Sequence, residues 1–358
     1  MEDYSQVESV EQFKPLSFWR RLLLSRDDLA EYYKLERKYL HEKGESLRGL
    51  GWRKKLQPIL LKLIELDRKV INRQSLRVLK DESVDTDKPV IYAITHMGKF
   101  DYQIVSEVIK KHQIPFSGDP ETMHRTLDGV LLGLNGIIYC DTDDKEDRKI
   151  ATDTSIELLK SGNNLLIYPE GVWNVSSNLL MLPLFPGIIR MAYETGCEIV
   201  PVAVEQYDKD FVVNIGKNFK VEEMLFETKE EEKEYIDSKK EELRDEMATL
   251  KWEIFESMPM QVRKELGDYA SENRRFVDTR LYEWFNKKEN RPFYDDETIE
   301  RRTFRAKNVV LSKEAFSFFG KMKLNKKNAF LYAKRLEFPD EINDMIEKEL
   351  EGNTEKVR

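Results

Sequence analysis

Short runs of apolar and β-branched residues alternate with helical stretches between residues 87 and 216. The runs expected to form strands are 89–95, 136–140, 165–168, 198–204 and 211–215. Strands that alternate with helices build a largely parallel sheet, because a parallel connection must cross back over the sheet through the intervening helix. We therefore predict an α/β fold, with a mostly parallel sheet flanked by helices.

The segments on either side of this region are predicted to be mainly helical. Before residue 86, apolar side chains such as Leu56, Leu60 and Ile64 recur at helical spacing among charged ones. After residue 226 the charge is dense, and an apolar stripe at helical spacing persists at Ile236, Leu243, Met247, Leu250 and Ile254. We predict an N-terminal amphipathic helical arm at 1–86, an α/β core at 87–225 and a charged, mainly helical C-terminal extension at 226–358.

Charge and cysteine content narrow the classes of function. The net charge is -8, whereas nucleic-acid-binding domains are usually basic, so no nucleic-acid partner is expected. Cys140 and Cys197 are the two cysteines, and they have neither metal-ligand spacing nor a disulfide framework. No bound metal or cofactor is expected, and a reducing, cytoplasmic location is predicted.

The sequence also predicts that the chain does not span a membrane. Its longest nearly apolar run, 179–189, is about half of the roughly 20 residues that a spanning helix needs. Two segments instead combine aromatic, aliphatic and basic residues as interfacial segments do, and they lie at 13–24 and 52–64. We expect a cytoplasmic protein with a candidate peripheral contact to the membrane face through these segments, or an amphipathic arm packed on its own core.

A histidine and an aspartate stand where the first predicted strand of the core meets a helix. His96 directly follows the strand, and Asp101 comes five residues later. Within one regular helix this step would point the two side chains about 140° apart, so pairing requires His96 in the turn and Asp101 in the first helical turn. An aspartate on one imidazole nitrogen fixes the tautomer and leaves the other nitrogen as a general base.

A second strand of the core ends in Tyr168, Pro169, Glu170 and Gly171. Pro169 cannot continue a central ladder, so the carboxylate of Glu170 and the backbone of Gly171 come to the sheet edge. Glu170 is a candidate for holding hydroxyl groups of a substrate that accepts a transferred group. Gly171 is a candidate for a close approach of the backbone to a ligand. The chain has no Gly-x-Ser-x-Gly motif, so a covalent serine intermediate has no support and the acceptor itself would be the nucleophile.

These motifs resemble those of the glycerophospholipid and lysophospholipid acyltransferases, typified by the acylglycerol-phosphate acyltransferases. The resemblance covers about 110 residues and four blocks in order, which are His96 with Asp101, residues 168–171, residues 184–187 and residues 199–203. It implies O-acyl transfer in phospholipid biosynthesis, from acyl-CoA or acyl carrier protein to a lysophosphatidic acid-like hydroxyl. His96 would be the general base and Asp101 would orient it.

The chain departs from this family at the residues assigned to the acceptor phosphate. Val172, Trp173 and Asn174 follow Gly171 where the family has Thr-Arg-Ser, and Thr142 stands where the family has an arginine. Lys99, Arg148 and Arg190 are alternative candidates for a replacement cation. Trp173 offers a flat face to a sugar or an acyl chain. Two alternatives therefore stay open, an acyltransferase with a glycan or glycolipid acceptor and a catalytically silent lipid-binding protein.

Overall fold

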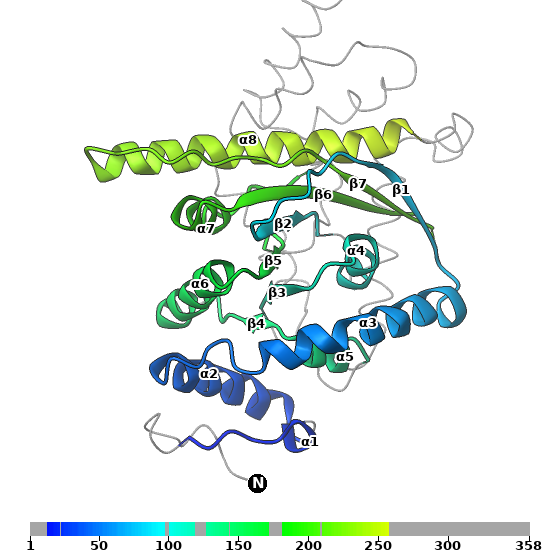
Figure 1. The fold of residues 1–358 in the computed structure, drawn as a ribbon, viewed down its shortest axis with the longest axis vertical. Coiled ribbons are helices and arrows are strands. Elements are labelled where there is room, and N and C mark those ends of the chain that lie inside the picture. Colours follow the sequence, from blue (N-terminus) through cyan, green and yellow to red (C-terminus); the bar gives the residue numbers. More distant parts are fainter. Residues whose placement is uncertain are drawn as a thin grey trace, which may run out of the picture.

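A seven-stranded sheet forms the centre of the protein, with helices on both faces (Figure 1). The computed structural model describes residues 13–21, 23–96, 100–118, 127–142, 144–171, 181–207 and 210–257. Its strands are β1 Ser75–Asp81, β2 Val90–Ile94, β3 Gln113–Ser117, β4 Ile138–Tyr139, β5 Asn164–Ile167, β6 Glu198–Tyr207 and β7 Asp210–Ile215. They lie side by side in the order β1-β7-β6-β2-β5-β3-β4.

Every neighbouring pair in this sheet is parallel except β6 and β7, which form an antiparallel pair. The described helices are α1 Phe18–Arg21, α2 Arg26–Glu42, α3 Leu50–Leu66, α4 Asp101–Ile109, α5 Leu127–Asn135, α6 Lys145–Lys160, α7 Gly187–Thr195 and α8 Lys229–Glu256. One π-helical turn, η3 Asp67–Ile71, extends α3. The predicted α/β class, with a mostly parallel sheet flanked by helices, is confirmed.

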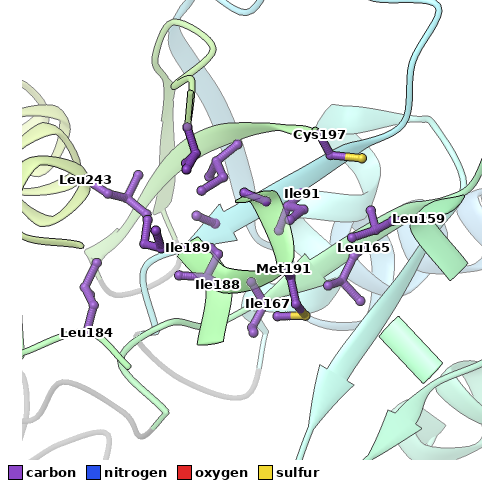
Figure 2. Close-up of a cluster of buried hydrophobic side chains, with 14 of the residues drawn as sticks. Ile91, Leu159, Leu165, Ile167, Leu184, Ile188, Ile189, Met191, Cys197 and Leu243 are labelled. Atoms are coloured by element: carbon purple, nitrogen blue, oxygen red, sulfur yellow. The ribbon is translucent and has the colours of Figure 1, made fainter. Parts of the chain in front are cut away.

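The central strand β2 is buried on both faces, as expected for a parallel sheet between two helical layers. Ile91 and Ala93 face a cluster that α6, α7 and α8 complete, whereas Val90, Tyr92 and Ile94 face the side covered by α4. Figure 2 shows the first cluster, in which Leu243 of α8 approaches Ile189 of α7. All five members of the apolar stripe predicted beyond residue 226 are buried.

One expectation about the N-terminal arm is wrong. Residues 75–81 were expected to be helical, but they form β1, the edge strand that pairs with β7 in parallel. The strand is hard to recognise because its exposed side carries Arg77 and its register is interrupted between Val78 and Asp81. Strand β3 was also not predicted, whereas the other five strands fall on the predicted runs. The boundaries proposed at 86 and 225 stay predictions.

Candidate active site

His96 lies at the carboxyl end of β2, the edge where ligands bind in open α/β sheets. The preceding residue holds the strand end in place, since the Thr95 N–H donates to the Val202 carbonyl at 3.1 Å and the Thr95 hydroxyl exchanges hydrogen bonds with the backbone of Val204. The His96 side chain is 22% exposed. A reacting group from outside the protein can therefore reach this imidazole.

Asp101 is the first residue of α4, and its carboxylate lies 3.0 Å from Nδ1 of His96. The pair adopts the arrangement that the spacing predicts, with His96 in the turn and Asp101 in the first helical turn. Only 2% of the Asp101 side chain is exposed, and a helix N-terminus favours a carboxylate there. With Nδ1 as the donor to Asp101, Nε2 is the basic nitrogen of the neutral ring.

The neighbouring strand β5 brings Tyr168 against the same imidazole. The two rings stack with centroids 4.1 Å apart and planes 23° apart. Burial, followed by the nearby Asp101 charge, raises the pKa of Tyr168 well above its usual value, so the hydroxyl stays protonated. Tyr168 thus limits the rotation of His96 from one face while Asp101 holds the ring by its edge.

Glu170 is 2% exposed, and both of its carboxylate oxygens accept backbone N–H groups. Oε1 accepts from His96 at 3.1 Å and Oε2 accepts from Leu182 at 2.8 Å. Burial raises the pKa of this carboxyl, while Lys251 and the two backbone donors act in the opposite direction. These contacts are to groups of the protein itself and do not test whether Glu170 holds acceptor hydroxyls. That role stays a prediction.

Gly171 follows with φ +69°, a conformation that non-glycine residues rarely adopt. A Cβ added there would lie 2.4 Å from Cε2 of Phe185, so glycine also permits a close approach of two segments. The Gly171 N–H donates to the Tyr168 carbonyl at 2.9 Å and is thus used within the turn. It is therefore not directed at a substrate oxyanion.

Of the other sequence-predicted site residues, Lys99 and Trp173 lie outside the described residues. Thr142, which stands at a family arginine position, has its carbonyl bound by the side chain of the exposed Arg148. Within the described ranges, no group of three or more histidine, cysteine, aspartate or glutamate side chains is arranged to hold a metal ion.

Helix α8 brings two buried cations close to this site, and neither belongs to the motifs found in the sequence. Arg244 is 1% exposed and donates to the Met181 carbonyl, and Lys251 forms an ion pair with Glu205 at 2.9 Å. Arg244 directly follows Leu243 of the apolar stripe and Lys251 directly follows Leu250, so the two cations are seven residues apart. Basic residues that recur at the same spacing as a buried stripe indicate cations beside the core, and this pattern is visible in the sequence.

Comparison with protein-family models agrees with the interpretation of the motifs. Residues 75–205 match the family model described as Acyltransferase, and this match begins at the first residue of β1. The chain also aligns with the crystal structure of the 1-acyl-sn-glycerophosphate (LPA) acyltransferase PlsC from Thermotoga maritima. That alignment has 17% identity and a TM-score of 0.39, and it covers 61% of this chain and 98% of the other. No curated protein sequence matches the chain. Residues 75–205, which carry His96, Asp101, Glu170 and Gly171, are thus similar to the acyltransferase family.

Proposed function

We propose that the protein transfers a fatty acyl group from an acyl thioester to the hydroxyl of a lysophospholipid-type acceptor, such as lysophosphatidic acid. The observation that supports this most directly is the 3.0 Å contact between His96 Nδ1 and Asp101 at the carboxyl end of β2. The donor is acyl-CoA or acyl carrier protein, and no bound cofactor takes part in the reaction that we propose.

The reaction needs one base and one electrostatic partner. His96 Nε2 takes the proton of the acceptor hydroxyl as its oxygen attacks the thioester carbonyl carbon, and the Asp101 carboxylate stabilises the imidazolium. When the C–S bond breaks, the imidazolium returns the proton to the departing thiolate. An ester and a free thiol are the products, so atoms and charge balance without a covalent enzyme intermediate.

Thiol release from long-chain acyl-CoAs, with mixed lysolipids as acceptors, tests this proposal. We expect acceptor-dependent release that falls about 10²- to 10⁴-fold in His96→Ala, the range typical of general-base catalysis. Parallel assays with acyl carrier protein identify the carrier. Equal activity of wild type and His96→Ala would refute the role of His96.

The acceptor assay also separates the two alternatives. Glycan or glycolipid acylation is favoured by the replacement of family arginines, for example by Thr142. It predicts that uncharged sugar acceptors outcompete lysophosphatidic acid. Vesicle binding without turnover of any thioester would instead identify a catalytically silent lipid-binding protein.

We further propose that the enzyme works as a peripheral protein on the cytoplasmic face of a membrane, where lipid acceptors reside. In the described part of the chain, no helix is long and apolar enough to cross a bilayer. The structure instead exposes one face of α3 and of the π-helical turn η3 that extends it, which we name the α3 stripe. Its members are Trp52, Ile59, Leu63, Leu66 and Val70, each 47% to 62% exposed. They are spaced seven, four, three and four residues apart, so they line one side of a helix.

Charge and position both fit an anionic lipid surface. Residues 50–73 contain seven basic and two acidic residues, whereas the whole chain has a net charge of -8. Exposed Lys55 and Lys62 lie beside the stripe, as on helices that bind anionic interfaces. On its buried side α3 packs against Tyr102, the residue after Asp101, so docking would set the active site close to the lipid headgroups.

The other segment proposed for the membrane contact, residues 13–24, is described only in part. Phe13 and Leu24 are buried against Tyr32, so these two side chains cannot contact lipid, whereas Leu23 is exposed. We therefore assign the contact primarily to 52–64 and its continuation to Val70.

Flotation with vesicles tests the docking proposal. Wild type should float with vesicles containing about a third phosphatidylglycerol, and Ile59→Glu with Leu63→Glu should lose most of that binding while kcat on micellar acceptor is kept. Met224→Glu with Leu225→Glu is the matched control, because both side chains are exposed and apolar but lie before α8. Equal flotation of the two double variants would refute the proposal.

A further inference from the structure

A single peptide group, between Met181 and Leu182, lies between a buried cation and a buried anion. Its carbonyl accepts a hydrogen bond from Nη2 of Arg244 at 2.9 Å, and its N–H donates to Oε2 of Glu170 at 2.8 Å. The two bonds use opposite ends of the same amide. Arg244 of α8 and Glu170, 74 positions apart in the sequence, are therefore connected through this one peptide.

The same carboxylate extends the connection to the candidate base. The second oxygen of Glu170 accepts the backbone N–H of His96 at 3.1 Å. The order of contacts is thus Arg244, the Met181–Leu182 peptide, Glu170 and His96, which we name the Arg244 chain. Both charged side chains in it are almost fully buried, at 1% and 2% exposure.

The charges in the Arg244 chain act in the same direction. A guanidinium at a carbonyl oxygen and a carboxylate at the N–H of that peptide both increase its polarisation, so each hydrogen bond strengthens the other. Desolvation disfavours the charged form of Glu170, and Lys251, one of the cations of α8, is the leading influence that opposes it. Helix α8 thus supplies the positive charge that a buried carboxylate beside the active site requires.

We propose that Arg244 is a positioning residue, which fixes the backbone of His96 through the Met181–Leu182 peptide and Glu170. Helix α8 lies outside residues 75–205, which match the acyltransferase family model, yet it belongs to the catalytic unit. Glu170 accordingly acts on His96 rather than on the acceptor. The kinetic test of this inference rests on the proposed function, whereas the spectroscopic test below does not.

Steady-state kinetics distinguish positioning from acceptor binding. Glu170→Gln keeps the size of the side chain but puts an NH2 donor in place of one oxygen, so it cannot accept an N–H bond at each end. Arg244→Met keeps most of the length but cannot donate. Each should lower kcat about 10- to 100-fold, because small displacements of a catalytic group have effects of this size, while the acceptor KM changes less than twofold. A rise in acceptor KM with unchanged kcat in Glu170→Gln would overturn the proposal.

Two comparisons exclude a purely structural effect. The double variant should be no slower than the slower single variant, because both substitutions interrupt the same series of contacts, the Arg244 chain. Additive losses of kcat would contradict this. Arg37→Met is the matched control, since Arg37 also binds a buried carboxylate, that of Asp147, but in the contact of α2 with α6. A folded Arg37→Met with the same loss of kcat as Arg244→Met would overturn the assignment.

The backbone of His96 can be observed without any assay of activity. The chain has four histidines, so labelling with ¹⁵N-histidine gives at most four backbone amide signals, and His96→Gln identifies one of them. Arg244→Met should shift that signal and leave the others in place, and Arg244→Lys, which keeps a charged donor, should shift it less and restore most of kcat. If Arg244→Met does not fold, Arg244→Lys and Glu170→Gln serve instead. An unmoved His96 amide in the folded variants would overturn the proposal even if the chain proved to have another function.

Discussion

Replacing Asp101 by asparagine tests the reaction most sharply, because it removes a charge with almost no change of shape. The carboxylate is 3.0 Å from Nδ1 of His96 and only 2% exposed, so water screens the pair weakly. Two unit charges about 4 Å apart interact by about 4 kcal/mol at the effective dielectric constant of about 20 that suits protein sites. Loss of that interaction with the imidazolium corresponds to a fall in kcat of about 10²- to 10³-fold.

The assay is thiol release from acyl-CoA at saturating acceptor, with thermal unfolding to show that the variant is folded. Asp147→Asn is the control, because Asp147 is equally buried and also stands in the first turn of a helix, α6, but contacts Arg37. Asp147→Asn should keep kcat per folded molecule. If Asp101→Asn kept more than about a tenth of wild-type kcat, the imidazolium would not be the charged intermediate that Asp101 stabilises.

Three further outcomes follow from other contacts. Gly171→Ala should lower the free energy of unfolding by about 1–3 kcal/mol through backbone strain at φ +69° alone, and the clash of the new Cβ with Phe185 should lower it further. Adding Phe185→Ala should relieve the clash but not the backbone strain, and chemical denaturation measures both effects. Lys34 lowers the pKa of Asp144 to about 2, so this pair stabilises the fold above pH about 4. The melting temperature of Lys34→Met should therefore be below that of wild type at pH 5, and the difference should close as the pH falls toward 2. Cys140 and Cys197 are buried and burial raises both thiol pKa values, that of Cys140 to about 12, so thiol reagents should label them only after denaturation.

The motif residues could be located from the sequence because their positions depend on local structure. A strand that ends at His96 and a helix that starts at Asp101 bring the two together within one turn, and β5 is the neighbour of β2 in the sheet. Local sequence patterns did not identify β1 as a strand, because β1 depends on pairing with β7, more than 130 residues later in the chain. The contacts of Arg244 were likewise beyond prediction, since they depend on where α8 crosses the sheet.

The apolar stripe of α8 also tests the domain boundary predicted at residue 225. Its five members, Ile236, Leu243, Met247, Leu250 and Ile254, are all buried against the sheet and its helices. Burying one such side chain contributes about 1.5–3 kcal/mol, so removing all five would cost roughly 8–15 kcal/mol. That equals the whole free energy of unfolding of a typical domain.

A chain that ends at residue 225 should therefore lose its cooperative thermal transition, whereas a chain that ends at Ser257 keeps all of α8 and should retain it. The two truncations differ by only 32 residues, so circular dichroism melting curves compare them directly. If the shorter chain melted cooperatively near the wild-type temperature, α8 would be an appendage as its charged sequence suggests. Loss of the transition in the shorter chain alone would mean that the folding unit extends beyond the residues that match the acyltransferase family, as the position of Arg244 in the core requires.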